Sequence, residues 1–125
     1  PITVATLIQR IKKHLGVTRL DVAMPDKIAP DGYSPGKIQS VAVCAGAGGS
    51  VLKNEACVAD AYFAGEMRHH DVLAARARGT TVILCEHTNT ERGYLRIFRS
   101  RLARALGKGV EVRVSRTDIE PMEFV

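Results

Sequence analysis

The sequence has few of the features that mark membrane-spanning or base-stacking proteins. It contains no tryptophan, and aromatic residues make up 5% of its 125 residues. No apolar run approaches the roughly 20 residues that a helix needs to cross a bilayer, and the N-terminus lacks the charged and apolar regions of a signal peptide. We therefore expect no membrane association and a location in the cytoplasm or the nucleus.

Cysteine is also scarce. The chain has three cysteines, Cys44, Cys57 and Cys85, and no two of them form a CxxC pair. An odd number of widely spaced cysteines, in apolar or small-residue surroundings, is untypical of a disulfide framework or of a zinc site built from thiolates. We expect all three to be reduced residues of the core.

The balance of charge is basic but not extreme. Eighteen Lys and Arg against thirteen Asp and Glu give a formal charge of +5, which favours polyanions but is common among soluble proteins. Several arginines lie in segment 91–106, around an apolar stripe of Leu95, Phe98, Leu102, Ala105 and Leu106. No aromatic platform alternates with these arginines, so we expect most of them to be solvated and do not expect nucleic-acid binding.

Residues 1–125 are long enough for one compact α/β domain, since 46% of them are hydrophobic. Thr3 and Gly16 carry the start and stop signals of an N-terminal helix. Segment 19–24 alternates polar and apolar residues as an edge strand does, and three prolines predict an irregular loop over 25–37.

The rest of the chain predicts alternating strands and helices. We expect strands over 38–45, 61–64, 80–85 and 111–115, and helices over 50–58, 69–79 and 91–106. Because segment 38–45 is apolar almost throughout, it predicts a central strand. This order favours a three-layer α/β/α fold, in which helices cover both faces of a largely parallel sheet.

A glycine-rich loop follows the first of these strands. A strand, a GxG motif and a helix, with Glu66 downstream, are elements of a dinucleotide-binding unit, but the third glycine position holds Val51. We therefore do not expect NAD binding. Two interpretations stay open: small residues that permit a tight turn, or an anion-binding loop. The second would use Gly46, Gly48, Gly49 and Ser50.

Four further side chains follow the strand 61–64 and could line a site. They are Glu66, His69, His70 and Asp71. Imidazole and carboxylate groups can ligate metals or relay protons. Adjacent helical side chains diverge by about 100°, so we expect one of the last three to line a site while another packs or caps the helix.

His87 and Glu91 have HxxxE spacing at a junction between a strand and a helix. Both could reach one metal ion if the first helical turn brings Glu91 back over the loop. The alternative is a capping box, with Thr88 as the N-cap and Glu91 bonded to backbone amides. The local pattern does not separate these two interpretations.

Three longer segments point to a family. They are VAVCAGAGGSVL, ADAYFAGEMRHHDVLAARARG and TVILCEHTNTERGYL. In order and spacing they closely resemble the C-terminal part of the NIF-three-like family, also labelled GTP cyclohydrolase type 2 homologues. The resemblance implies an α/β fold of two intertwined, similar halves, homo-oligomers that are often hexameric rings, and a dinuclear metal centre.

The resemblance also implies roles for individual residues. His87 and Glu91 match late HxxxE ligands of a divalent metal such as zinc, manganese or iron. The family's paired histidines and aspartate belong to an N-terminal half that this chain lacks, and His69 and His70 fit a separate late segment. We therefore expect a C-terminal fragment that by itself binds metal weakly or not at all.

Two functions follow from the resemblance as expectations. The first is a metal-dependent hydrolase acting on a nucleotide or related phosphate compound. The alternative is a non-catalytic interaction or assembly module, with protein partners and a link to transcriptional regulation. The apolar tail 122–125 is a candidate for exchange between copies of the chain.

Overall fold

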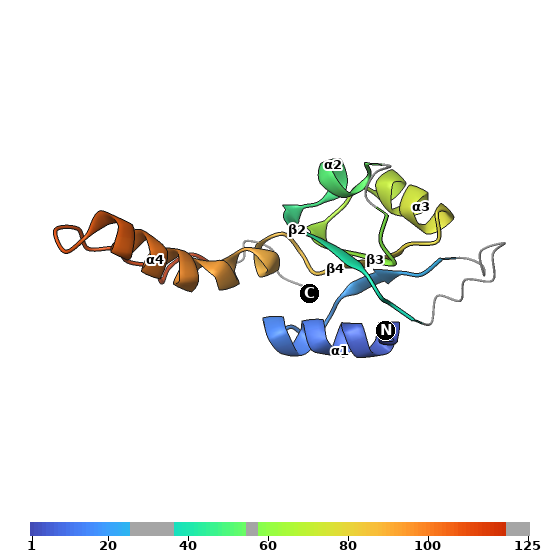
Figure 1. The fold of residues 1–125 in the computed structure, drawn as a ribbon, viewed down its shortest axis with the longest axis horizontal. Coiled ribbons are helices and arrows are strands. Elements are labelled where there is room, and N and C mark those ends of the chain that lie inside the picture. The colour runs from blue at the N-terminus through green and yellow to red at the C-terminus, as the bar shows by residue number, and fades with distance from the viewer. Residues whose placement is uncertain (26–36, 55–57, 120–125) are drawn as a thin grey trace.

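The chain folds into a four-stranded sheet with helices on both faces, as the computed structural model shows (Figure 1). The structure describes residues 1–25, 37–54 and 58–119. The elements in chain order are α1 (Val4–Leu15), β1 (Asp21–Ala23), β2 (Val41–Ala47), α2 (Gly49–Leu52), β3 (Ala61–Glu66), α3 (His69–Ala77), β4 (Thr81–Leu84), the short 3₁₀ helix η1 (Thr88–Thr90) and α4 (Arg92–Leu106).

The strands lie in the order β1-β4-β3-β2. β2, β3 and β4 are parallel neighbours, whereas β1 pairs with the edge of β4 in the antiparallel direction. The predicted α/β fold with a largely parallel sheet is therefore confirmed, and β1 is the predicted edge strand. Parallel pairing also brings the C-terminal ends of three strands to one edge of the sheet.

Apolar side chains form a separate cluster on each face of the sheet. Tyr62 and Val82 pack with Ala75 of α3 on one face. Ala61 packs with Val4 of α1 on the other face. Successive strand residues point to opposite faces, so the neighbours Ala61 and Tyr62 belong to different clusters. The three layers are visible in Figure 1, with α1 on one side of the sheet and α2 and α3 on the other.

The ends of α1 are those predicted from sequence. The Thr3 side chain accepts a hydrogen bond from the Thr6 N–H at 3.1 Å, and Gly16 adopts a left-handed conformation with φ 72°. The Gly16 N–H donates to the Lys12 carbonyl. Both caps satisfy backbone groups that a helix end would otherwise leave unpaired, which is why these two residue types mark the helix.

The prediction that segment 38–45 is a central strand is wrong. β2 begins at Val41 and forms an edge of the described sheet, where Val43 is 65% exposed. Ile38 instead forms an isolated antiparallel bridge with Ile2 and is buried. An apolar run shows that side chains favour burial, but it does not show what buries them. Within the described residues no other strand pairs with the outer edge of β2.

The predicted strand over 111–115 is also wrong. This segment runs beside α4, where Arg99 Nε donates to the Val112 carbonyl at 2.9 Å and Arg92 pairs with Asp118 at 3.2 Å. α4 extends away from the sheet and carries the segment out of reach of its edges (Figure 1). The alternating valines therefore match the sequence pattern of a strand, but in the described residues no neighbouring strand pairs with them.

Other predictions fall partly outside the described residues. The helix predicted over 50–58 is a single turn, α2, and residues 55–57 are not described. Most of the predicted loop over 25–37 and the tail 122–125 are not described either. Cys44 and Cys85 are free thiols, half-buried and buried respectively, while Cys57 lies outside the described residues. No helix in the described ranges is long and apolar enough to cross a membrane.

Gly65, in the central strand β3, lies where three stretches of backbone approach one another. A Cβ atom at Gly65 would lie 2.8 Å from each of three backbone atoms: the Glu86 carbonyl oxygen, the Gly46 carbonyl oxygen and the His87 Cα. None of these atoms can move without moving a strand end. Only glycine fits at this position, for reasons of space rather than backbone angle.

We predict that Gly65→Ala lowers the free energy of unfolding of the intact protein by about 1–3 kcal/mol, because overpacked backbone must separate. Chemical denaturation measures this loss. Gly93→Ala is the matched control, since a Cβ there meets nothing within 4 Å and alanine favours the α4 helix. Equal stability of the two variants would contradict the close backbone approach.

Candidate metal centre

The candidate site lies at the C-terminal ends of the three parallel strands. β2 ends near Gly46, β3 ends at Glu66, and the chain leaves β4 through Cys85 and Glu86 to reach His87. Ligand sites of open α/β sheets form at this edge, where loops after the strands converge. Parallel pairing thus brings together residues that are 20 or more positions apart in sequence.

His87 contacts two carboxylates through its two ring nitrogens. Nδ1 lies 2.9 Å from Oε1 of Glu66, and Nε2 lies 3.4 Å from Oε1 of Glu91. The three side chains are each about half exposed. The structure therefore brings the predicted pair His87 and Glu91 together and adds Glu66 on the opposite side of the ring.

The two carboxylates also set the protonation of His87. The hydrogen bond with Glu66 is the main cause that raises the pKa of His87 above its ordinary value; desolvation opposes this shift, and the Glu91 charge adds to it. Both carboxylates can only accept, so in the neutral ring the shorter contact, 2.9 Å to Glu66 against 3.4 Å to Glu91, favours the proton on Nδ1. The Nε2 lone pair then faces Glu91.

Thr90 fastens this loop to β2. Its hydroxyl accepts a hydrogen bond from the Gly46 N–H at 2.7 Å and donates to the His87 carbonyl at 2.7 Å. Gly46 itself has φ 63°, and a Cβ there would lie 2.7 Å from Glu91 Oε1 and 2.8 Å from His87 Nε2. The glycine thus leaves space for both donor atoms beside the strand end.

The predicted capping box does not form. η1 occupies residues 88–90, and α4 begins only at Arg92, without a side-chain cap at its first turn. The Glu91 carboxylate faces His87 instead of the helix amides. The turn is held by Asn89, whose Nδ2 donates to the Cys85 carbonyl at 2.7 Å, and Glu86 adopts a left-handed conformation with φ 69°.

Cys85 adjoins the site but is poorly suited to bind metal. Burial is the main cause that raises the pKa of the Cys85 thiol to about 11, and the Glu86 charge adds to it. Metals bind the thiolate, and at neutral pH this thiol keeps its proton. In the described residues no group of three or more His, Cys, Asp or Glu side chains could hold a metal ion. The role of His87 and Glu91 as metal ligands therefore stays a prediction.

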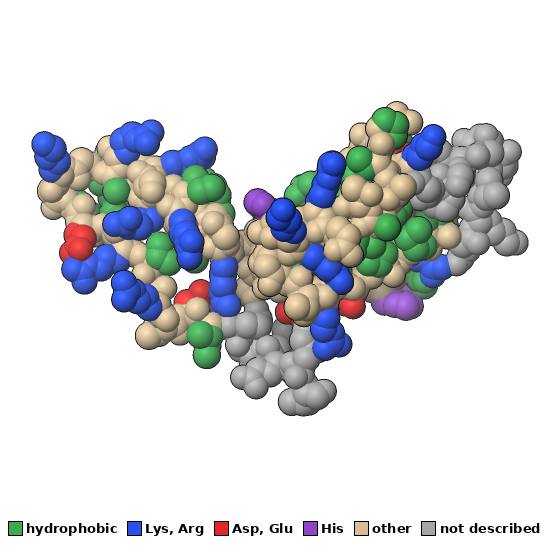
Figure 2. Space-filling model, turned by 90° about the horizontal axis from the view of Figure 1, so that it is seen from below, with side chains coloured by type: hydrophobic (Ala, Val, Ile, Leu, Met, Phe, Trp, Pro, Cys, Tyr) green, Lys and Arg blue, Asp and Glu red, His purple; other side chains and the backbone are tan. Residues whose placement is uncertain are grey.

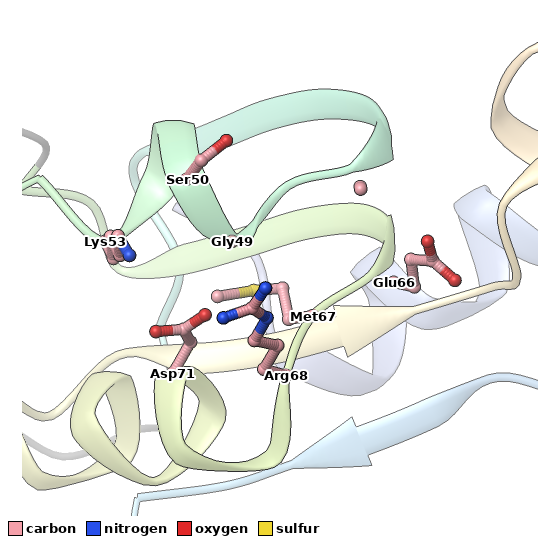
Figure 3. A pocket seen from close by; sticks show the side chains of 8 residues that line it. Gly49, Ser50, Lys53, Glu66, Met67, Arg68 and Asp71 are labelled. Atoms are coloured by element: carbon pink, nitrogen blue, oxygen red, sulfur yellow. The ribbon is translucent and has the colours of Figure 1, made fainter.

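The remaining predicted site residues divide between two places. Glu66, Gly49, Ser50 and Asp71 line a cavity of about 490 Å³ between α2 and α3 (Figure 3). His69 and His70 are exposed on α3, with their rings edge to face, and neither of them lines this cavity. The structure therefore does not bring these two histidines to His87.

The backbone amides of the glycine loop are partly occupied by the protein itself. The Gly46 N–H bonds to Thr90, and the Gly48 N–H donates to the Glu66 carbonyl at 2.9 Å. Gly49 and Ser50 are left at the cavity wall. Anion binding by this loop therefore stays a prediction only for Gly49 and Ser50, which line the cavity.

Sequence reasoning missed four residues that shape this region. They are Lys53, Gly65, Arg68 and Thr90. In the sequence, Thr90 is typical of a residue at the start of a helix. Gly65 is a glycine in a strand, and the sequence does not indicate which backbone segments approach it. Arg68 precedes the paired histidines, so its position after a strand end could have drawn attention to it.

A family model described as Duf34/NIF3 (NGG1p interacting factor 3) matches residues 1–121. The chain belongs to the Duf34/NIF3 family. NIF3-like protein 1 of Rattus norvegicus is 44% identical over 124 residues, which are 99% of this chain and 31% of the relative. NGG1-interacting factor 3 of Saccharomyces cerevisiae is 40% identical over 97% of this chain and 41% of the relative.

A solved structure shares the fold of this NIF3 chain. The Staphylococcus aureus protein SA1388 superposes with a TM-score of 0.72, at 20% identity, over 99% of this chain and 34% of that chain. The present NIF3 chain thus spans about a third of the rat relative and of the SA1388 chain. The resemblance seen in the three sequence segments is confirmed at the level of family and fold.

We predict that Thr90→Val lowers the free energy of unfolding of this NIF3 protein by about 1–3 kcal/mol, because it removes both hydrogen bonds of the Thr90 hydroxyl. Thr90→Ser keeps the hydroxyl and should retain most of the stability. Denaturant titration of the two variants measures the difference. Thr90→Val as stable as Thr90→Ser would show that the hydroxyl does not hold the loop.

Proposed function

We propose that His87 and Glu91 are ligands of a divalent metal ion in a metal-dependent hydrolase. The supporting observation is the distance of 3.4 Å between His87 Nε2 and Glu91 Oε1. Two donors about 2.1 Å from one ion, at a tetrahedral angle, lie about 3.4 Å apart. The existing separation thus fits a shared zinc, manganese or iron ion without movement of the helix.

The donor set also fits in its chemistry. Neutral imidazole and carboxylate both suit divalent ions of this kind, and Gly46 leaves both donor atoms unobstructed beside β2. The other ligands come from outside the described residues, as expected for a chain that spans about a third of a relative. Metal affinity therefore belongs to the intact protein.

Glu66 positions His87 for this role. Metal-bound histidines commonly donate their second ring N–H to a carboxylate, which fixes the tautomer and the ring orientation. The contact of 2.9 Å between Nδ1 and Glu66 gives that arrangement. Glu66 is at the end of the central strand β3, so a rigid element holds the carboxylate that orients the ring.

The proposed reaction is hydrolysis of a nucleotide or a related phosphate compound. A bound divalent ion polarises a phosphoryl oxygen and makes water more acidic. The protein side chains bind and orient: Glu66 holds the imidazole in place, and Thr90 holds the loop that carries it. Exposure of the three side chains keeps the site open to a small substrate.

We predict that His87→Ala and Glu91→Gln strongly reduce the zinc or manganese bound by the intact protein, because each removes a donor. Glu66→Gln should lower affinity by a smaller amount, about tenfold or more, because it only loosens the ring. Elemental analysis after dialysis, together with competition by a chelator, measures both effects.

His14→Ala is the control for these variants, since His14 is exposed near the end of α1 and far from β3 in sequence. It should keep the full metal content. Unchanged metal content in both His87→Ala and Glu91→Gln would refute the proposed centre.

A second function is favoured by the surface of α4. The helix contains no buried residue, and Tyr94, Ile97 and Phe98 are 47%, 53% and 48% exposed. From below, Figure 2 shows Lys and Arg side chains spread over the lobe that α4 forms, with apolar side chains between them. Exposed apolar surface rimmed by charge is typical of protein interaction sites. This observation supports an assembly module that pairs copies of the chain.

We predict that Phe98→Asp converts such an assembly to smaller particles, because a buried carboxylate opposes contact at the α4 surface. Sedimentation velocity of the intact protein measures the change. Ser100→Asp adds the same charge at another exposed position of α4 and should leave the particle size unchanged. Unchanged size in Phe98→Asp would remove α4 from the interface.

A further inference from the structure

The cavity between α2 and α3 carries two cations that the metal centre does not use. Lys53 follows α2 as its C-terminal cap, and Arg68 precedes α3 as its N-terminal cap. Both line the cavity of about 490 Å³, together with the side chain of Ser50. This volume lies within the range of small-molecule sites, about 300–1,000 Å³.

Among the residues that the structure describes, neither cation has a carboxylate partner within 4.0 Å. Asp71 nevertheless lines the same cavity. Figure 3 shows Arg68 and Asp71 on the α3 side, Lys53 and Ser50 on the α2 side, and Glu66 at the far end. Two cations from different elements thus line one cavity.

The cavity adjoins the candidate metal centre through one residue. Glu66 lines the cavity and is hydrogen-bonded to His87 at 2.9 Å. Its charge is therefore engaged with the imidazole, which leaves Asp71 as the remaining carboxylate against two cations. Without Glu66, the two cations and the one carboxylate of the cavity have a net positive charge, which favours an anion.

We propose that this cavity binds the phosphate group of a small phosphate ester, with the rest of the ligand directed past Glu66 toward His87. Arg68 presents a fork of N–H donors that matches phosphate oxygens, and Lys53 supplies a compact second positive charge. Asp71 accepts from a hydroxyl or amino group of the ligand.

The direction toward His87 rests on the proposed metal-dependent function, whereas the phosphate subsite rests on the cavity alone. Two cations suit the double negative charge of a phosphate monoester better than the single charge of one carboxylate. Gly49 lets the start of α2 lie close to Asp71, since a Cβ at position 49 would lie 2.7 Å from Asp71 Oδ2. The subsite thus joins α2 to α3 through the ligand.

The test is calorimetric titration of the intact protein with 5′-AMP, adenosine and succinate, in the presence of a chelator of divalent ions. We expect AMP to bind at least about tenfold more tightly than adenosine or succinate. Lys53→Ala and Arg68→Ala should each weaken AMP binding by about tenfold or more, because each removes a charge-assisted hydrogen bond. Arg68→Lys should restore part of the loss.

Arg78→Ala is the matched control, because Arg78 is exposed at the opposite end of α3. It should bind AMP as the unmodified protein does. Adenosine or succinate binding as tightly as AMP would overturn the phosphate assignment, and so would unchanged AMP affinity in both Lys53→Ala and Arg68→Ala.

The chelator separates this proposal from the metal centre. Suppose that elemental analysis without chelator finds no metal in the intact protein, while AMP binding with chelator still depends on Lys53 and Arg68. That result would refute the metal centre and leave the phosphate subsite. Stoichiometric metal without AMP binding would refute the subsite and leave the metal centre.

Discussion

The close approach of three backbones at Gly65 is the constraint on which the site depends. β2, β3 and the loop after β4 meet there so tightly that no side chain fits at this position. This contact places the His87 backbone against the central strand, so the imidazole reaches Glu66 at the end of the same strand. The position of the two proposed metal donors, His87 and Glu91, is therefore set by sheet packing as well as by the conformation of the loop.

Short hydrogen bonds then fix the conformation of the loop between β4 and α4. Thr90 ties the loop to the Gly46 amide, and Asn89 closes the turn onto the Cys85 carbonyl. The residue after Cys85, Glu86, adopts an uncommon left-handed conformation, which redirects the chain from β4 into η1. The result is a loop whose side chains lie beside the strand ends while His87 and Glu91 stay about half exposed.

Glu66 couples the two candidate sites because its carboxylate holds His87 and also lines the neighbouring cavity. A ligand anchored by Lys53 and Arg68 would therefore lie beside the group that orients the metal donor. α4 is a separate feature, because none of its residues is buried against the described part of the chain. The proposed metal centre and the proposed assembly surface thus lie on different elements of the chain.

The sequence by itself determined the local features and the family. Thr3 and Gly16 marked α1 because capping is local, and the order of strands and helices predicted a parallel sheet. Three separate segments identified the family, and the resemblance to that family, rather than HxxxE spacing alone, selected His87 and Glu91 as candidate ligands. Only the tertiary structure decided what depends on distant neighbours. It made β2 an edge strand, left 111–115 without a strand partner, and replaced the capping box with a contact between Glu91 and His87. It also placed Glu66 beside His87, and Lys53 and Arg68 on the wall of one cavity, because these positions depend on strand register and on close backbone approach, which no short stretch of sequence encodes.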